Sequence, residues 1–565
     1  MSTKLNAAGR IPLESRLVSF SDHRGLKIVA YVDEGVETEW NGRFVILAPR
    51  YGETKKNSLQ LAYTLVVNGF KVLRFDQSNH IGESDGTMDQ FTLSGAADDI
   101  VAAVRYVDSF CEPEEIALVA LSLSCRRGLR ACAMEPRISR LINVVGMVDM
   151  DSTLQAIYKR DFFGELSSGA EWRMVDILGF EIDGKHFHDD LLESDMKTLS
   201  GTLKDAAEVK IPVLHLSAEN DRWVLYSDVE QVIAKCANGR ILKVPDVGHE
   251  INENTQALQF VFQQLILFCA EGLDLAGREL RQPDKRTLIA QNKIERQRLQ
   301  QIMKFADSEN DFWGDYLGKF GIIEDAHYYA DYFQTMSQQL GSIQDGDVVL
   351  DAGCGNGFYG VSLVRSLLRE FLVGMGAVKQ LHYCGIDLTA NGLARSYSRQ
   401  NEELKAITAE SSIPIMPISY SYRKIDFDTL SDEPGTTLPF ADASISKLCC
   451  SLVLSYLKEP SKLIGEFYRI LKPGGVAVIS SMKPGCDMTV LYHSYVDVDT
   501  PDATRDQDAN RLLSAAGKIK LKRDTGIYNF FSEVELERLA FDAGFTDIRS
   551  FRSLGNQANA IRVVK

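Results

Sequence analysis

The stretch ALVALSLSCRRG (Ala117–Gly128) decides how the first part of this chain is interpreted. A short apolar run ends at Ser122, and basic residues follow it. This pattern is typical of a buried strand that turns sharply into a helix and exposes a serine at the turn. Such turns usually read G-x-S-x-G, whereas Ala120 and Ser124 hold the outer positions here. Alanine and serine are the next smallest side chains, so the tight packing of such a turn remains possible.

The partners that a serine nucleophile needs follow it in the chain. Asp221 comes just after the apolar stretch PVLHLSA, and His249 comes just after RILKVPD. An imidazole must take the proton of the serine hydroxyl, and a carboxylate must orient and stabilise that imidazole. Serine, acid and histidine in this order, each past a predicted strand, predict a catalytic triad of Ser122, Asp221 and His249. The alternative is that Ser122 is a structural strand residue, which leaves the other two positions unexplained.

A serine nucleophile also requires hydrogen-bond donors for the charge that develops on the substrate oxygen. The stretch FVILAPRYGET (Phe44–Thr54) follows an early strand, where serine enzymes with parallel sheets place the first donor. We therefore predict the backbone N–H of Tyr51 as the first donor and that of Leu123 as the second. His80 lies near the predicted site, and we interpret it as a residue that orders its loop rather than as a second base.

Two blocks of the 565-residue chain alternate predicted strands with predicted helices, which indicates an α/β fold with mostly parallel sheets. Between the blocks, Arg286–Asp307 has helical periodicity and mixed charge, and an aromatic segment follows it. We predict a first domain at residues 1–275 with a lid at about 149–210, a helical bridge at 276–340 and a second domain at 341–565. The predicted strands are KIVAYV, RFVILAP, KVLRFD, IALVAL, LINVVGM, PVLHLSA and RILKVPD in the first block, and VVLDAG, YCGIDL, SKLCCS, GGVAVISS and a pair near Phe551 and Ile561 in the second.

Composition narrows the function classes. The net charge of −16 argues against sequence-independent binding to nucleic acid. No window approaches the roughly 18 apolar residues of a membrane helix, and MSTKLNAAGRIPLESR lacks the apolar core of a secretory signal, so we expect no membrane insertion. The ten scattered cysteines form no C-x-x-C pair, which favours a reducing cytoplasm and predicts no metal site. We interpret His186 and His188 as part of a solvated surface.

The first block resembles the acyl-ACP thioesterases, or acyl transferases, of bacterial bioluminescence. The similar stretches are ILAPRYGE, VLRFDQSNHIGESDGTMDQFTLS, LVALSLSCR, SAENDRWV and GHEINEN, and the resemblance covers about Leu17–Ile302. That family uses a serine turn without the usual glycines, and by resemblance its triad falls on Ser122, Asp221 and His249. The resemblance implies an α/β-hydrolase fold, an acyl-serine intermediate, and a fatty acyl substrate carried by an acyl carrier protein or by CoA.

One departure from that family is the basic character of the residues after the serine turn. Arg126, Arg127 and Arg130 either contact an acidic carrier protein or its phosphopantetheine, or form a solvated helix face. The sequence does not decide between these two interpretations. The residues from Asp149 to Lys210 lie between two predicted core strands, and we expect them to form the lid over an apolar acyl pocket.

VVLDAGCGNGFYG (Val348–Gly360) opens the second block with a strand and a glycine-rich turn. Glycines let the backbone approach a ligand closely. The spacing G-x-G-x-G at Gly353, Gly355 and Gly357 differs from the G-x-G-x-x-G of dinucleotide-binding folds. Asp351 precedes the first glycine by two residues. We predict that these four residues bind a cofactor.

The second block resembles the class I S-adenosylmethionine-dependent methyltransferases over about Gly341–Lys565. The similar stretches are YCGIDLT, KIDFDT, LPFADASISKLCCSLVLSYLKEP and GEFYRILKPGGVAVIS. The resemblance implies a Rossmann-like domain that binds S-adenosylmethionine. It also implies that Asp387 meets the ribose hydroxyls, and that Asp426 and Phe427 meet the adenine.

Both resemblances together predict two enzymes in one chain, and four hypotheses remain for how they cooperate. In the first, the N-terminal domain cleaves an acyl thioester and the C-terminal domain methylates the released acid, since fusion raises the local concentration of the intermediate. In the second, both domains act on a secondary metabolite, and the methyl group goes to oxygen, nitrogen or carbon elsewhere on its scaffold. A fusion of a carboxyl methyltransferase with a methyl-ester esterase ranks third. In the fourth, one half only docks a carrier protein, which the intact motifs of both halves argue against.

Overall fold

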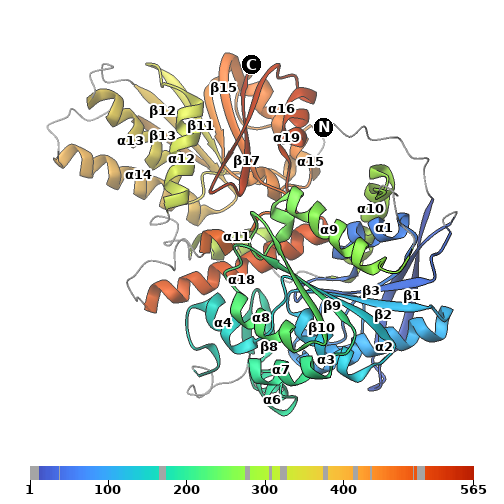
Figure 1. The fold of residues 1–565 in the computed structure, drawn as a ribbon. Coiled ribbons are helices and arrows are strands. Elements are labelled where there is room, and N and C mark those ends of the chain that lie inside the picture. The colour runs from blue at the N-terminus through green and yellow to red at the C-terminus, as the bar shows by residue number, and fades with distance from the viewer. Residues whose placement is uncertain are drawn as a thin grey trace. The chain divides into compact units, whose positions relative to one another are not determined.

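The computed structural model describes residues 12–36, 39–164, 174–273, 280–303, 308–318, 327–372, 380–410, 418–432, 435–487, 489–492 and 503–565 (Figure 1). The chain divides into two compact units, Met1–Lys304 and Phe305–Lys565. Each unit holds one large, mostly parallel sheet with helices, which confirms the predicted α/β class. None of the helices in the described ranges is long and apolar enough to cross a membrane.

The first unit contains an eight-stranded sheet. Across the sheet the strands are β1 (Leu13–Ser21), β2 (Lys27–Gly35), β4 (Lys71–Phe75), β3 (Arg43–Ala48), β5 (Glu115–Leu121), β6 (Ile138–Val144), β9 (Pro212–Ala218) and β10 (Asn238–Val244). β2 is antiparallel to β1 and β4, and the strands from β4 to β10 are parallel to one another. The parallel strands therefore end at one edge of the sheet, where α/β folds hold their ligands.

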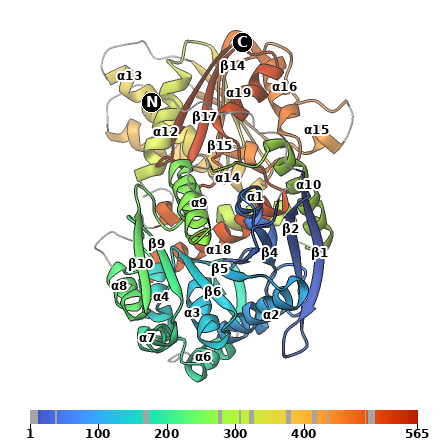
Figure 2. The same cartoon turned by 45° about the vertical axis from the view of Figure 1, so that its right-hand side comes forward.

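Helices cover both faces of this sheet (Figure 2). One face packs against α2 (Leu93–Cys111), α3 (Ser124–Met134), α7 (Leu199–Glu208) and α8 (Tyr226–Lys235), and the other against α1 (Leu59–Val67) and α9 (Thr255–Cys269). Alternate residues of β3 serve the two layers: Phe44 and Ile46 join the first core, and Val45 and Leu47 join the second. Burial on both faces explains why this strand is a continuous apolar run.

The predicted lid at 149–210 is an insertion between β6 and β9 that contains several elements. They are α4 (Met150–Tyr158), the hairpin β7 (Met174–Ile177) and β8 (Phe180–Asp183), α6 (Gly184–Glu193) and α7. The last of these packs against α3 and contributes Ala206 to the core beneath the sheet. The C-terminal part of the predicted lid is therefore a layer helix.

The stretch 276–340, predicted as a helical bridge, is divided between the two units. α10 (Lys285–Ile302) packs against α1 in the first unit, whereas α11 (Glu309–Gly318) and α12 (His327–Leu340) belong to the second. α10 covers most of the helix that periodicity predicts at Arg286–Asp307, and residues 304–307 of that prediction lie outside the described ranges. Periodicity alone does not reveal the surface that each helix covers.

The second unit contains a seven-stranded sheet. Its order is β13 (Ile418–Lys424), β12 (Leu381–Asp387), β11 (Asp347–Ala352), β14 (Ile445–Cys450), β15 (Leu471–Met482), β17 (Ala558–Val564) and β16 (Asp547–Ser553). The first five strands are parallel, and β17 is antiparallel to both neighbours. The strand order reverses between β11 and β14, which is the position where open parallel sheets bind ligands.

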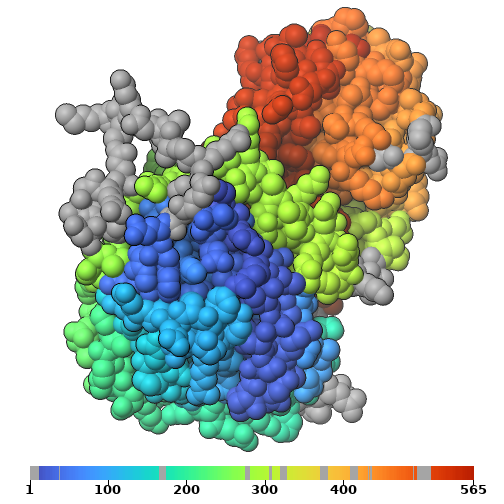
Figure 3. Space-filling view, turned by 90° about the vertical axis from the view of Figure 1, so that its right-hand side faces the viewer, coloured from blue at the N-terminus to red at the C-terminus, as the bar shows by residue number. Residues whose placement is uncertain are grey.

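Helices flank this second sheet as well. They include α12, α13 (Phe358–Leu372), α14 (Ala390–Glu410), α16 (Pro460–Ile470) and α19 (Glu533–Asp542), and the unit also contains α15 (Thr429–Asp432) and α18 (Ala503–Thr525). α16 and α19 pack with the inner strands in one apolar core. In the space-filling view the first unit is coloured from blue to green and the second from yellow-green to red (Figure 3). The blue atoms belong to the N-terminal strands and helices of the first unit.

Candidate active sites

Ser122 lies on the sharp turn between β5 and α3, in the left-handed region with φ of +56°. A non-glycine residue adopts this conformation only where its surroundings impose it. The Ser122 N–H donates to the Val144 carbonyl at 2.9 Å, and the Ser122 carbonyl accepts from the N–H groups of Cys125 and Met147 at 3.0 and 3.1 Å. These hydrogen bonds fix the strained turn that carries the Ser122 hydroxyl.

Small residues around the turn explain why the usual glycines are dispensable. A Cβ added at Gly128 on α3 would lie 3.1 Å from the Cβ of Ala120, so the helix already packs closely on the strand. Ser124 is fully buried, and its hydroxyl donates to the carbonyl of Pro49. The serine that replaces the second glycine therefore ties the turn to the loop after β3.

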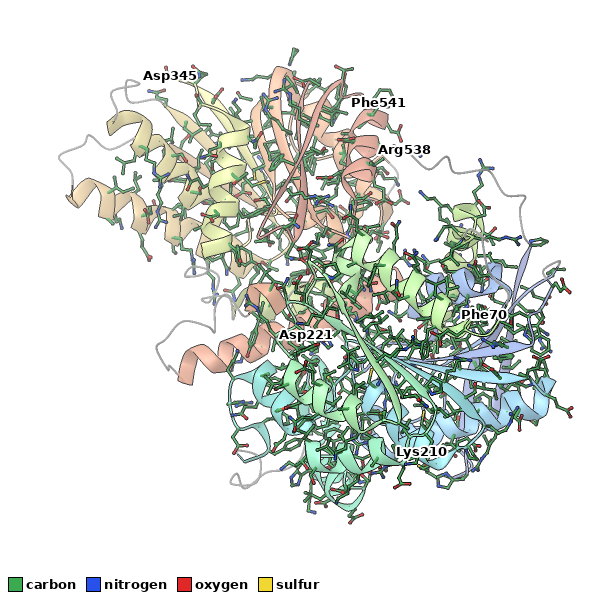
Figure 4. The ribbon with its side chains drawn as sticks, in the orientation of Figure 1. Phe70, Lys210, Asp221, Asp345, Arg538 and Phe541 are labelled. Carbon is green, nitrogen blue, oxygen red and sulfur yellow. The ribbon has the colours of Figure 1, made fainter. Side chains whose placement is uncertain are left out.

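The structure brings together the three residues predicted as a triad. Ser122 Oγ lies 2.8 Å from His249 Nε2, and His249 Nδ1 lies 2.9 Å from Asp221 Oδ2. All three side chains are buried or nearly so, and each follows the C-terminal end of a strand. Figure 4 labels Asp221 in the loop after β9. The geometry is that of a nucleophile, its base and an orienting carboxylate.

The carboxylate is held ionised by its surroundings. Burial on its own raises the pKa of the Asp221 carboxyl, but the His249 imidazole and the backbone N–H groups of Trp223 and Val224 hold that pKa below its ordinary value. The Trp223 ring also stacks on the His249 ring, with centroids 4.3 Å apart and planes 21° from parallel. The sequence analysis missed Trp223, although its place two residues after Asp221 was visible.

We expect the substitution Trp223→Ala to lower kcat for thioester cleavage about tenfold, because it frees the imidazole to leave its catalytic orientation. The measurement is steady-state hydrolysis of an acyl thioester. Trp40→Ala is the matched control, since Trp40 bonds the carbonyl of Arg43 at the opposite end of β3. Equal losses of kcat in both variants would show that the stacking of Trp223 does not orient the His249 imidazole.

The loop after β3 offers the predicted oxyanion donors. The backbone N–H groups of Tyr51 and Leu123 donate to no other residue within the described ranges. The loop itself is firmly held: the Pro49 carbonyl accepts from Arg127 Nη2 at 3.0 Å and from Gln77 Nε2 at 3.2 Å. Two predicted donors without a protein acceptor, on a fixed backbone beside Ser122, suit an oxyanion.

His80 supports the same loop. Its Nε2 accepts the N–H of Gly52 at 3.1 Å. Burial and the neighbouring Arg127 guanidinium lower the pKa of His80 to about 3, so its imidazole is neutral near pH 7. This geometry agrees with the interpretation of His80 as a loop-ordering residue.

Two of the three basic residues of α3 are internal, which corrects their interpretation as part of a carrier-binding patch or a solvated face, whereas Arg130 is partly exposed. Arg126 and Arg127 are buried. Arg126 pairs with Asp205 of α7 at 2.5 Å, and Arg130 pairs with the same carboxylate at 2.9 Å. Arg127 donates to the Pro49 carbonyl and to Gln77. The partners lie far away along the chain, so the sequence could not reveal that these charges are internal.

The second unit has a cavity of about 330 Å³ at the C-terminal edge of its sheet. Six of the seven predicted cofactor residues line it: Asp351, Gly353, Gly355, Asp387, Asp426 and Phe427. Gly357 does not line it. A Cβ on Gly357 would lie 2.5 Å from the Cα of Ser396, so this glycine is explained by the close approach of α14.

Two buried carboxylates surround the glycine turn. Asp387 Oδ2 accepts the Gly355 N–H at 2.9 Å, and its Oδ1 accepts from Thr389. Asp351 Oδ2 accepts the Tyr383 hydroxyl at 2.5 Å, whereas its Oδ1 has no hydrogen-bond partner within the described ranges. Burial raises the pKa of Asp351 to about 7, although the Tyr383 hydroxyl opposes that shift. An unpaired buried carboxylate oxygen beside a cavity favours a cationic or hydrogen-bond-donating ligand.

The other wall of the cavity is aromatic; the bridge aromatics near Tyr328–Tyr332 and residues after Cys450 were predicted to line it, whereas Trp313 and Tyr316 were not predicted from the sequence. It consists of Trp313, Tyr316, Tyr329, Phe333 and Tyr456, with the carboxylate of Glu309 beside them. Glu309 accepts from Lys522 Nζ at 2.8 Å, from the Tyr528 hydroxyl at 2.6 Å and from Trp313 Nε1 at 3.1 Å. The aromatic residues that precede β11 in the sequence could have indicated this wall.

We expect Gly353→Ala to abolish ligand binding in this cavity and to lower the stability of the second unit. Gly353 has φ of +81°, and an added Cβ would lie 2.1 Å from Val453 Cγ2. The measurement is thermal unfolding with and without S-adenosylmethionine. Gly346→Ala is the control, because Gly346 has φ of +79° with nothing within 4 Å of an added Cβ. If the two variants lose ligand binding and stability equally, backbone strain alone explains the loss, and the contact with Val453 does not contribute.

Comparison with known proteins assigns both units. A family model described as acyl transferase matches residues 17–297, and one described as methyltransferase domain matches residues 324–550. The chain joins an acyl transferase domain to a methyltransferase domain. The serine site lies in the acyl transferase domain, and the 330 Å³ cavity lies in the methyltransferase domain.

Individual relatives match the acyl transferase domain. The acyl transferase of Photobacterium leiognathi is 27% identical over 46% of this chain and 82% of that protein. The acyl transferase of Photobacterium phosphoreum is 26% identical over 39% of this chain and 72% of that protein. Among solved structures, Est1E from Butyrivibrio proteoclasticus with bound ferulic acid is 20% identical over 45% of this chain and 98% of that chain, with a TM-score of 0.37.

Proposed function

We propose that the acyl transferase domain cleaves a fatty acyl thioester through an acyl-Ser122 intermediate. The observation that carries this proposal is the pair of hydrogen bonds from Ser122 to His249 and from His249 to Asp221. The similarity to bacterial acyl transferases supports the acyl group, and the sequence resemblance supports an acyl carrier protein or CoA as its carrier.

The proposed reaction proceeds in two halves. Ser122 Oγ attacks the thioester carbonyl while His249 Nε2 takes the hydroxyl proton, and Asp221 stabilises the imidazolium. The N–H groups of Tyr51 and Leu123 donate to the oxyanion. Collapse breaks the carbon–sulfur bond, and His249 returns the proton to the leaving thiolate. Water, or another acceptor hydroxyl, then releases the acyl group by the same steps in reverse.

We propose that the methyltransferase domain binds S-adenosylmethionine, which supplies an electrophilic methyl group on a sulfonium. The residues present fit this cofactor. Asp387 has two oxygens at the glycine turn, Asp426 and Phe427 line the adenine side of the cavity by family resemblance, and Asp351 has an unpaired oxygen. A positively charged ligand would also be stabilised by these carboxylates.

The methyl acceptor has two candidates. The first is the carboxylate of the fatty acid that the other domain releases. The second is an uncharged group on a different scaffold, and the charges of the cavity favour it. Five carboxylates line the cavity, namely Glu309, Asp351, Asp387, Asp426 and Asp428. The one cation among its described lining residues, Lys458, pairs with Asp432 at 2.9 Å. Although Lys522 pairs with Glu309 and the pKa of Asp351 is raised to about 7, the lining carries more carboxylates than cations, so a fatty acid carboxylate would meet repulsion.

Product analysis tests the whole proposal. The full chain is incubated with acyl-CoA and acyl carrier protein thioesters of several chain lengths, with and without S-adenosylmethionine. Free fatty acid that requires Ser122 supports the thioesterase half. Accumulation of that acid without a methyl ester supports an uncharged acceptor, whereas a fatty acid methyl ester overturns it. No hydrolysis of any thioester would contradict the acyl substrate.

A further inference from the structure

Helix α10 inserts a carboxylate into the interior of the acyl transferase domain. Glu295 is 2% exposed, and among the residues of α10 only Leu299 is buried with it. Its Oε2 accepts from Arg74 Nη1 and its Oε1 from Arg74 Nη2, both at 2.7 Å. This bidentate pairing is the strongest hydrogen-bonding geometry available to the two side chains.

Arg74 at β4 connects that carboxylate to the chain after the oxyanion loop. Arg74 is fully buried, and its other side pairs with Asp33 of β2 at 2.6 and 3.1 Å. Its Nη1 also donates to the carbonyl of Lys55 at 3.0 Å. Lys55 opens the short helix η1 (Lys55–Ser58), four residues after Tyr51. The guanidinium thus bridges α10 and the backbone that follows the predicted oxyanion donor.

A second set of ion pairs and hydrogen bonds holds Lys55 through its backbone N–H and its ammonium group. The Lys55 N–H donates to Asp76 Oδ1 at 2.7 Å, and Lys55 Nζ lies 2.5 Å from Asp76 and 2.6 Å from Glu83. Glu83 in turn accepts from Arg298 of α10 at 2.6 Å. Two residues of α10, one turn apart, therefore reach Lys55 through separate partners.

The network lies outside the catalytic hydrogen bonds, and its residues do not touch Ser122, His249 or Asp221 in any hydrogen bond of the described chain. Its members are the cations Lys55, Arg74 and Arg298 and the carboxylates Asp33, Asp76, Glu83 and Glu295. A buried, hydrogen-bonded network of this kind defines one backbone arrangement more than it adds stability. The backbone it defines is the loop that leads from Tyr51 to η1.

We infer that Glu295 is a positioning residue for the oxyanion donor of Tyr51, acting through Arg74 and the Lys55 carbonyl. This inference rests on the proposed thioesterase function. Removal of the Glu295 charge leaves Arg74 with one carboxylate, so the guanidinium shifts toward Asp33 and away from the Lys55 carbonyl. A small displacement of the Tyr51 N–H weakens the bond to the transition state far more than binding of the substrate.

The test uses two probes on the whole chain of 565 residues and on its variant Glu295→Gln. The first is an acyl trifluoromethyl ketone thioether, which adds to Ser122 as a tetrahedral oxyanion. The second is an acyl thioether without a carbonyl, which fills the acyl site but forms no oxyanion. We expect Glu295→Gln to bind the ketone about 10 to 100 times more weakly and the thioether with unchanged affinity. In thioester hydrolysis we expect kcat to fall by the same factor while KM stays constant.

Comparison of the two probes removes the effect of lost folding, because unfolded protein binds neither. Lys293→Gln on the exposed face of α10 is the control for charge removal from the helix, and Glu295→Asp is expected to recover part of the ketone affinity. Equal affinities of Glu295→Gln and wild type for the ketone would overturn the inference. Failure of wild type to form the Ser122 adduct would instead overturn the proposed function.

Discussion

The substitution Ser122→Ala is expected to abolish thioester cleavage, with a loss of about 10⁴-fold or more in kcat. The remaining groups can bind the substrate and its oxyanion, but no nucleophile remains within 2.8 Å of His249 Nε2. Alanine meets the same left-handed backbone as serine, so we expect the melting temperature to change by only about 1–2 °C. The measurements are thiol release from an acyl-CoA and thermal unfolding.

Binding of S-adenosylmethionine by the other domain serves as the internal control for Ser122→Ala. Its affinity is expected to be that of wild type, because the two sites belong to separate compact units. Thioester cleavage by Ser122→Ala within tenfold of the wild-type rate would contradict the role of this serine. Loss of both activities would point to misfolding.

The substitution Asp351→Asn is expected to stabilise the ligand-free methyltransferase domain and to weaken the binding of S-adenosylmethionine. Burial raises the pKa of Asp351 to about 7 in the folded state, above the ordinary 3.8 of the unfolded chain. The folded domain therefore holds a proton that the unfolded chain has lost between about pH 4 and pH 7, and wild-type stability falls as pH rises through that window. Asparagine carries no charge, so the advantage of the variant grows up to about pH 7 and is constant above it.

Calorimetry at pH 5 and pH 8 measures this effect on the unfolding transition that S-adenosylmethionine shifts. We expect Asp351→Asn to raise that melting temperature by several degrees at pH 8 and by less at pH 5, and to bind the ligand at least about tenfold more weakly. Asp542→Asn at an exposed position of α19 is the control. If Asp351→Asn melts at a lower temperature than wild type at pH 8, burial of the Asp351 carboxylate does not destabilise the folded domain.

The sequence predicts the parallel cores well because buried parallel strands are continuous apolar runs. The strands β3, β5, β6 and β9, which lie inside the first sheet, follow directly from such runs. β1 and β13 were missed, because both are edge strands whose exposed positions carry polar residues such as Glu14, Arg16 and Ser419. A half-exposed strand has no continuous apolar signal.

The candidate site also contains residues that the sequence predicts and residues that only the structure reveals. The proximity of Ser122, Asp221 and His249 was predictable, because a serine nucleophile restricts both the types of its partners and their order along the chain. The supports of the site were not: Arg127, Arg74 and Glu295 are charged residues whose partners lie far away in sequence. A charged residue on a helix is usually solvated, so only the packed structure reveals those that are internal.

Mass spectrometry of the acylated full-length protein tests the central claim most directly. The protein is mixed with an acyl carrier protein thioester, quenched in acid within milliseconds to seconds, and digested for peptide mapping. The account predicts one acyl group on the peptide that contains Ser122, absent from Ser122→Ala. An acyl group on another residue, or turnover of the thioester without any acyl-enzyme on Ser122 at any quench time, would contradict it.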